Sequence, residues 1–278
     1  TTTTMAASIA SFYSGAKVCH VEAGLRTFNK KAPFPEEINR TITGHIADYH
    51  FAPTQNSFDN LIREGISDSN ILISGNTVID ALIQSVDRVD KMDDDEIENL
   101  KNVIDFTRRI ILVTGHRREN HGQGFINICQ ALKKIGDSVK NVQIIYPVHL
   151  NPKVQGPVYE ALSNATNVKL IKPLAYPAFV WLMNKTELVI TDSGGVQEEA
   201  PSLGKPVLVM RDTTERPEAV KAGTVILVGT SKEKIVNETL NLLNNPEHYK
   251  KMSKLHNPYG DGNACNRIVS FMENTAYN

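Results

Sequence analysis

The sequence lacks the features that mark membrane, secreted and nucleic-acid-binding proteins. No apolar run approaches a membrane span, and the N-terminus has neither the basic start nor the apolar core of a signal peptide. Lysine and arginine number 30 against 31 aspartates and glutamates, so the net charge of −1 leaves no basic field for nucleic acid. These absences predict a globular, cytoplasmic protein with no membrane or nucleic-acid partner.

Cysteines and cofactor motifs are equally scarce. The three cysteines, Cys19, Cys129 and Cys265, are widely scattered and predict neither a disulfide framework nor a CxxC pair. The eight histidines form no HExxH motif, which argues against a structural metal. There is no Walker A sequence, and the glycines at 122–124 lack the third glycine of a dinucleotide motif, so ATP and NAD are disfavoured. No Gly-Xaa-Ser-Xaa-Gly elbow is present.

What is present is an alternation of strands and helices. Runs that are apolar throughout, such as 110–113, suit parallel strands covered on both faces. Strands are expected at residues 17–21, 49–52, 71–74, 110–114, 142–148, 168–171, 187–191, 206–210 and 224–228, with helices between them, for example at 35–47, 55–64, 77–89 and 124–135. The acidic segment 91–98 is the strongest shift in composition. The pattern predicts an α/β protein of two Rossmann-like, doubly wound parallel-sheet domains, 1–105 and 106–255, with a cleft between them.

The first of these domains is expected to be incomplete. Residues 1–13 predict a capped helix before the strand at 17–21, and in an α/β fold such a helix is a crossover from an earlier parallel strand. Neither an earlier strand nor an initiator methionine stands in the sequence. We therefore expect the first βα units to be missing, with any site residues they hold.

The most informative stretch is 187–199, where a buried strand ends in Asp192-Ser193-Gly194-Gly195 and a helix follows at once. Adjacent glycines let a ligand approach the backbone, and the free N–H groups and positive dipole end of the helix favour a phosphate. Glu198 and Glu199, one turn further in, could take sugar hydroxyls. A helix start with a tight turn and a serine cap explains the pattern about as well.

Other candidate residues also follow strands. Glu22 lies at the end of a strand, which is where doubly wound sheets bind their ligands, so it could contact a ligand. The alternative is that it forms an ion pair with Arg26. Glu36 stands at the start of a helix, where the positive end of the helix dipole alone accounts for a glutamate. Alternatively, Glu36 and Glu22 form a pair of carboxylates in one site, whose pKa values are pushed apart. His116 and Arg117 follow a strand end and suit a diphosphate or proton transfer. Residues 211–218 would supplement an anion site or form a solvated loop. Together these groups predict an enzyme that handles a nucleotide-diphosphate sugar.

Seven motifs are shared with one known family: His20–Arg26, Pro35–Arg40, Thr114–Arg118, Tyr146–Pro152, Thr191–Gly204, Arg211–Pro217 and Asn257–Gly262. Over its full length the chain resembles the bacterial non-hydrolysing UDP-N-acetylglucosamine 2-epimerases. The resemblance implies a GT-B-like fold and a C-terminal helix, within 256–278, that crosses back to the first domain. It implies reversible conversion of UDP-N-acetylglucosamine to UDP-N-acetylmannosamine for surface polysaccharides. The C2 proton is removed, UDP is eliminated to leave a 2-acetamidoglucal, and UDP adds back with protonation on the other face.

The resemblance also implies residue roles, without a cofactor or metal. It makes Glu22, Glu36 and His116 catalytic. The substrate-binding set comprises Arg117, Leu174, Phe179, Ser193, Gly194, Gly195, Glu199 and Arg216. Of these, Ser193-Gly194-Gly195 would bind the diphosphate, Glu199 the ribose, and Leu174 and Phe179 the uracil. Some relatives have a polar side chain at position 174, so only a backbone contact would survive there.

The resemblance leaves other functions open. Family members have an Arg/Lys-bearing loop and a catalytic aspartate before the threonine run, and neither stands in this sequence. A nucleotide-sugar-binding remnant without turnover is therefore one alternative. A hydrolysing relative, which releases free N-acetylmannosamine, and a GT-B glycosyltransferase are others, although the Glu22, Glu36 and His116 set favours epimerase chemistry. The implied partners are the UDP-sugar and a second copy of the chain, since relatives are commonly homodimers.

Overall fold

The computed structural model describes residues 1–276 and divides into two compact units. Unit 1 comprises residues 1–83 and the segment from Pro258 onward, and unit 2 comprises residues 84–257. Of the predicted C-terminal segment 256–278, residues 277 and 278 lie outside the described residues.

The boundary between the units differs from the one that composition predicted. It falls between Ile83 and Gln84, inside helix α4 (Thr77–Val89), rather than between residues 105 and 106. Helix α5 (Asp95–Val103) explains the difference, because it packs on α8 (Tyr176–Lys185) of unit 2. The carboxylate of Glu96 in α5 also accepts the N–H of Ala175, at 2.8 Å.

Unit 1 is built on a three-stranded parallel sheet in the order β1-β2-β3. Its elements are α1 (Thr2–Tyr13), β1 (Cys19–Val21), α2 (Glu36–Ile46), β2 (Tyr49–Ala52), α3 (Gln55–Arg63), η1 (Asp68–Asn70), β3 (Ile71–Ile73), the first half of α4, and α13 (Ala264–Ala276). Ala23, Ala52, Leu61 and Ile71 form a buried cluster. The ring of Phe271 in α13 contacts Tyr49 and Phe51 of β2 edge-on, which joins the C-terminal helix to this sheet.

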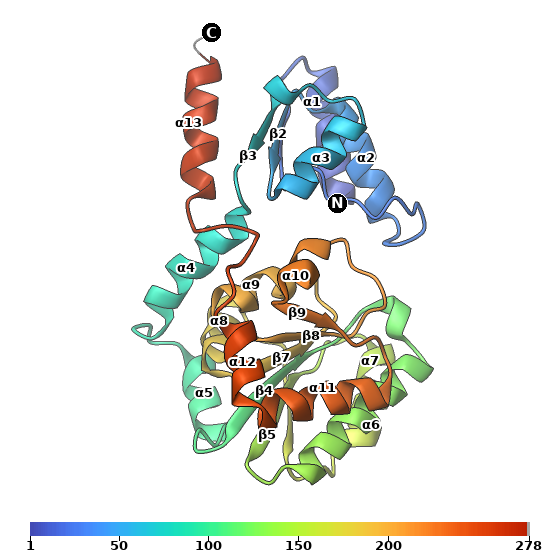
Figure 1. The fold of residues 1–278 in the computed structure, drawn as a ribbon, viewed down its shortest axis with the longest axis vertical. Helices are drawn as coiled ribbons and strands as arrows, with labels where there is room; N and C mark the ends of the chain where they lie inside the picture. The colour runs from blue at the N-terminus through green and yellow to red at the C-terminus, as the bar shows by residue number, and fades with distance from the viewer. Residues whose placement is uncertain (277–278) are drawn as a thin grey trace. The chain divides into compact units, whose positions relative to one another are not determined.

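Unit 2 is built on a six-stranded parallel sheet in the order β6-β5-β4-β7-β8-β9 (Figure 1). Besides α5 and α8, its elements are β4 (Arg109–Thr114), η2 (Arg118–Asn120), α6 (Gln123–Ser138), β5 (Val142–Pro147), α7 (Pro152–Leu162), β6 (Val168–Ile171), β7 (Leu188–Thr191), α9 (Val196–Ser202), β8 (Val207–Val209), α10 (Pro217–Ala222), β9 (Val225–Leu227), α11 (Lys232–Asn244) and α12 (Pro246–Ser253). The strand order reverses between β4 and β7. Such a switch point leaves a crevice at the carboxyl ends of the two strands, where doubly wound sheets bind ligands.

Both faces of this sheet are covered. Alternate residues of β7, Leu188 and Ile190, join the core cluster formed with α6, α7 and α11, whereas Val189 is fully buried outside that cluster. Helices α8 and α9 contact β4 and β7. Strands buried on two faces have to be apolar throughout, which is why unbroken apolar runs marked them in the sequence.

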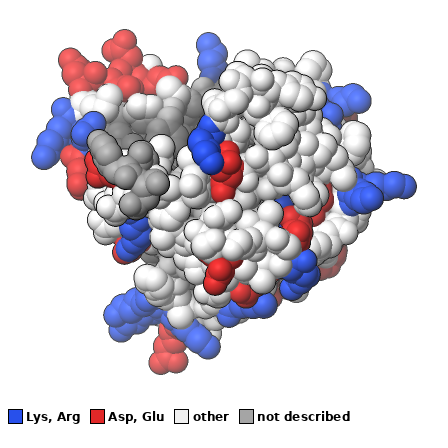
Figure 2. Space-filling model, turned by 90° about the horizontal axis from the view of Figure 1, so that it is seen from above, with Lys and Arg blue, Asp and Glu red and all other residues white. Residues whose placement is uncertain are grey.

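The predicted α/β class is confirmed, and all nine predicted strands occur within two residues of their expected bounds. Within residues 1–276 no helix is long and apolar enough to cross a membrane. On the face seen in Figure 2, acidic and basic side chains are both spread among uncharged ones, which fits the near-zero net charge.

Candidate functional site

The switch point brings together two of the predicted motifs. His116 and Arg117 follow β4, and the Ser193-Gly194-Gly195 turn follows β7. Asp192, fully buried between them, accepts the backbone N–H groups of His116 and Arg117, each at 2.9 Å. The histidine loop and the glycine turn are therefore fixed to each other.

The glycine turn leaves backbone donors available. Helix α9 begins after Gly195, and no side chain caps it, so the serine-cap interpretation is wrong. The N–H of Ser193 donates instead to Oγ1 of Thr191. Within residues 1–276 the N–H groups of Gly194, Gly195 and Val196 find no acceptor. Unbonded donors at the start of a helix are an arrangement that favours an anion, so the diphosphate-binding role of this turn stays a prediction.

A cavity of about 310 Å³ adjoins this turn. It is lined by residues from the ends of several strands and from the start of α8: Thr114, Gly115, His116, Pro147, His149, Pro173, Leu174, Tyr176, Phe179, Ser193, Val196 and Glu199. Five of the predicted site residues of unit 2 therefore share one cavity: His116, Leu174, Phe179, Ser193 and Glu199. The cavity combines apolar walls with few polar groups, which is typical of a small-molecule site.

Glu199 is prepared as a hydrogen-bond acceptor inside this cavity. The hydroxyl of Tyr176 donates to its Oε1 at 2.8 Å. Burial raises the pKa of Glu199, and the bond from Tyr176 opposes that rise. Burial and the nearby Glu199 carboxylate in turn raise the pKa of Tyr176, so this hydroxyl stays protonated and donates.

His116 lines the same cavity, and its side chain is partly exposed. Its ring stacks on that of His149, with centroids 5.3 Å apart and planes 18° apart. Partial burial lowers the pKa of His116, the Asp192 carboxylate raises it, and His149 and Arg117 lower it. A histidine in this setting is neutral near pH 7 and can accept a proton or a hydrogen bond.

Arg216 does not line this cavity. Its guanidinium is buried against two carboxylates, those of Glu198 and Glu215, and it lies beside Gly194. Arg211 also pairs with Glu215, at 2.9 Å. The alternative of a solvated loop at 211–218 is therefore wrong for Arg211, Glu215 and Arg216, all of which are buried. Of the two glutamates expected to take sugar hydroxyls, Glu198 is engaged by Arg216.

In unit 1, Glu22 has an unusual backbone. Its φ is +62°, a left-handed conformation that costs a non-glycine residue about 1–3 kcal/mol and often occurs at functional sites. The amide of Asn76 approaches its Oε1 at 3.5 Å. The alternative pairing with Arg26 is wrong, because Arg26 forms a bidentate ion pair with Glu64.

Glu36 and Glu37 have different environments at the start of α2. Glu37 is buried, and its carboxylate accepts the N–H groups of Thr27 and Phe28. Glu36 is half-exposed. Glu22 and His20 line a small cavity of about 80 Å³, and Glu36 is not among its lining residues. The pairing of Glu22 with Glu36 therefore stays a prediction.

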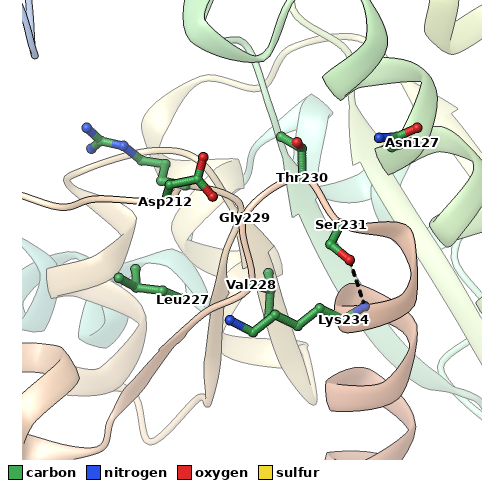
Figure 3. A pocket seen from close by; sticks show the side chains of 9 residues that line it. Asn127, Asp212, Leu227, Val228, Gly229, Thr230, Ser231 and Lys234 are labelled. Atoms are coloured by element: carbon green, nitrogen blue, oxygen red, sulfur yellow. Dashed lines mark hydrogen bonds between the residues drawn. The ribbon is translucent and has the colours of Figure 1, made fainter.

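A second cavity of unit 2, of about 400 Å³, includes Arg211 and Asp212 of the predicted segment 211–218 but none of the other predicted site residues. It lies between the start of α11 and the loops after β8 and β9, where Asp212, Thr230 and Lys234 line it (Figure 3). Ser231 caps α11 by accepting the N–H of Lys234. The Asp212 carboxylate lies close to Gly229 and opposes an anion there, so we do not assign the site to this cavity.

Sequence reasoning missed three residues of the site: Tyr176, His149 and Asp192. Tyr176 and His149 stand in or near recognised motifs, but nothing in their spacing shows that they meet Glu199 and His116. Asp192 was noted only as part of a turn. Its position directly after a buried strand was the one available signal.

Comparison with known proteins identifies one family. Residues 1–273 match the family model described as UDP-N-acetylglucosamine 2-epimerase. The chain is 58% identical over 276 residues to the protein of that name from Escherichia coli K12, covering 99% of this chain and 73% of the relative. The corresponding protein of Campylobacter jejuni is 52% identical over 277 residues, covering 98% and 72%.

Solved structures agree. The UDP-GlcNAc 2-epimerase of Neisseria meningitidis, bound to UDP-GlcNAc, superposes with a TM-score of 0.94 at 47% identity, covering 99% of this chain and 74% of that one. A structure of S. aureus MnaA with UDP gives a TM-score of 0.93 at 41% identity, covering 100% and 74%. These relatives and the two parallel sheets confirm the predicted GT-B-like fold class.

Proposed function

We propose a reaction for this chain from the family to which it belongs, since the chain is a member of the UDP-N-acetylglucosamine 2-epimerase family. The reaction is the reversible conversion of UDP-N-acetylglucosamine to UDP-N-acetylmannosamine. The observation that supports it most directly is the cavity of unit 2, which His116, Ser193 and Glu199 line and which adjoins the glycine turn with its unbonded N–H groups.

In this proposal the cavity holds UDP. The Ser193-Gly194-Gly195 turn receives the diphosphate, Glu199 accepts the ribose hydroxyls, and Phe179 packs against the uracil. Leu174 offers the base only its backbone, because its side chain has no polar atom. Arg216 acts from behind the glycine turn, where its charge lies beside Gly194.

The chemistry is an elimination followed by re-addition. A base removes the C2 proton, the C1–O bond breaks with its electron pair leaving on UDP, and a C1–C2 double bond forms. Re-addition of UDP with protonation on the opposite face gives the epimer. A poorly acidic C2–H needs a positioned base and a stabilised leaving group. We assign the proton transfers to Glu22, Glu36 and His116, which requires the two glutamates to reach the sugar of the bound nucleotide.

The test is turnover of UDP-N-acetylglucosamine by the 278-residue chain in heavy water, followed by chromatography and NMR. Epimerisation predicts UDP-N-acetylmannosamine with deuterium at C2, and deuterium in recovered substrate. Release of free N-acetylmannosamine with UDP would instead indicate the hydrolysing reaction, and transfer to an added acceptor a glycosyltransferase. UDP binding without any turnover would leave a nucleotide-sugar-binding protein and would reject the proposal.

We extend the proposal to the setting of the enzyme. Nucleotide sugars for surface polysaccharides are the substrates that the family resemblance implies, and a cytoplasmic location fits the three free cysteines of the described chain. A homodimer is expected from the same resemblance. Light scattering coupled to gel filtration measures the mass directly, and a single species at one chain's mass would reject the dimer.

A further inference from the structure

Asp192 is a carboxylate in an unusual position. It follows β7 and is fully buried. Its Oδ2 accepts three N–H donors: the backbone of His116 at 2.9 Å, the backbone of Arg117 at 2.9 Å, and the side chain of Asn120 at 3.1 Å. A buried carboxylate is tolerated only with such partners. The number of donors from one loop indicates that Asp192 sets the shape of that loop.

Asp192 also joins this loop to the neighbouring turn. Its own backbone N–H donates to the carbonyl of Thr114, at 3.1 Å. The hydroxyls of Thr114 and Thr191 lie 2.6 Å apart across the two strands. Asp192 immediately precedes Ser193, so a single residue anchors both the loop that holds His116 and the turn proposed to hold the diphosphate.

The carboxylate faces one nitrogen of His116 in particular. Oδ1 of Asp192 lies 3.6 Å from Nδ1 of His116. A negative charge beside Nδ1 favours the tautomer with the proton on that nitrogen, which leaves a lone pair on Nε2. The ring of His149, stacked on the imidazole, restricts its rotation.

We propose that Asp192 is a positioning residue for the reaction: it fixes the loop orientation and the tautomer of His116, so that Nε2 is presented to the bound sugar nucleotide. This inference rests on the proposed function of the cavity. Asp192 itself touches no substrate, because it is enclosed by the loop that it holds.

Titration of His116 separates this role from simple support of the fold. The charged groups that act on His116 are Asp192 at the end of β7, His149 at the end of β5, and the adjacent Arg117. Asp192 raises the pKa of His116, whereas burial, His149 and Arg117 lower it. Removing the charge of Asp192 must therefore lower this pKa further. Loss of support for the loop with the charge of Asp192 kept predicts no such change.

The experiment compares Asp192→Asn with Asn120→Ala in the 278-residue chain labelled with ¹⁵N-histidine. Asn120 donates to the same Oδ2 and to the carbonyl of Met210, so its loss perturbs the loop but keeps the charge. In the wild type, His116 should show the Nδ1–H tautomer. Asp192→Asn should lower the titration midpoint of His116, and Asn120→Ala should not. An unchanged midpoint in Asp192→Asn, or an Nε2–H tautomer in the wild type, overturns the proposal.

Turnover provides a second readout. In Asp192→Asn we expect kcat to fall by about 10²–10⁴-fold, the range for a positioned proton-transfer group, with a much smaller change in UDP affinity. A rise in KM with an unchanged kcat would contradict the positioning role. If the wild type binds UDP but lacks turnover, the proposed function fails while the tautomer measurement still decides the role of Asp192. If Asp192→Asn does not fold, the tautomer in the wild type remains decisive.

Discussion

Gly194 lies so close to Arg216 that a Cβ atom at position 194 would stand 2.6 Å from Nη1 of the arginine. The guanidinium cannot easily move away, because it is buried and paired with Glu198 and Glu215. The glycine is therefore required by a side chain behind the turn, besides any ligand in front of it. The close approach also places a positive charge directly beneath the proposed diphosphate site.

The first prediction follows from this contact. Gly194→Ala should displace Arg216, weaken UDP binding at least about tenfold, which is about 1.4 kcal/mol, and destabilise unit 2 by about 1–3 kcal/mol through overpacking. Gly156→Ala in α7 is the matched control, since a Cβ there would meet no heavy atom within 4 Å and Gly156 is not among the proposed site residues. Calorimetry with UDP and urea unfolding measure both effects. Equal UDP affinity and equal stability in the two variants would show that the Arg216 side chain moves aside without cost.

A second prediction concerns the hydroxyl of Tyr176. Its bond to Glu199 holds the pKa of that carboxyl down against the effect of burial. In Tyr176→Phe the pKa of Glu199 should rise further, so the carboxylate that accepts the ribose hydroxyls is protonated at higher pH. UDP affinity should then be lost earlier as pH falls.

Calorimetry from pH 8 to pH 5 measures this shift. Tyr159→Phe is the control, because Tyr159 is exposed on α7 and lines a different groove. If UDP affinity falls at the same pH in Tyr176→Phe and in the wild type, the hydrogen bond from Tyr176 to Glu199 does not determine that affinity.

The fold was predictable from the sequence because its signals are local. Each parallel strand is an apolar run, and its bounds follow from the run itself, as for Val168–Ile171, which the structure reproduces. The position of a motif after a strand also told which end of the sheet it occupies. Hence the cavity residues Ser193 and Glu199 could be named in advance.

The roles of individual charges were not predictable, because they depend on contacts between distant residues. Glu198 and Glu199 are adjacent and look equivalent in sequence, yet one pairs with Arg216 and the other with Tyr176. Asp192 meets residues more than 70 positions away. No periodicity or motif spacing encodes these pairings.

The adjacent glutamates of α2 give a third prediction. Glu37→Gln should destabilise unit 1 by about 1–3 kcal/mol, because a charged acceptor of the Thr27 and Phe28 N–H groups is lost. Glu36→Gln should leave stability unchanged, since Glu36 is half-exposed, and should lower turnover by about 10²–10⁴-fold if it transfers a proton. Urea unfolding and the heavy-water assay separate the two. Full activity in a folded Glu36→Gln variant would remove Glu36 from the catalytic set.

The fourth prediction concerns acid stability and arises from His20 on β1. Burial, together with repulsion from His50, Arg26 and Arg40, lowers its pKa from 6.5 to about 4. The unfolded chain therefore takes up a proton below about pH 6.5, while the folded chain does so only near pH 4. Stability is present at neutral pH and is lost as pH falls between these values, by about 3 kcal/mol in total for this group.

His20→Gln should reduce the loss of stability at acid pH, because glutamine does not titrate. His256→Gln is the control, since His256 is exposed and its replacement should leave the pH dependence unchanged. Hydrogen exchange of peptides that cover β1 and β2, corrected for intrinsic rates, reports the stability of this sheet at pH 7, 5.5 and 4.5. The edge-on ring of His50, 6.4 Å away, should retain part of the dependence in His20→Gln, since burial also lowers its pKa. An unaltered pH profile in His20→Gln would mean that His20 becomes protonated in the folded state without cost, and that the burial of its ring does not limit the stability of unit 1.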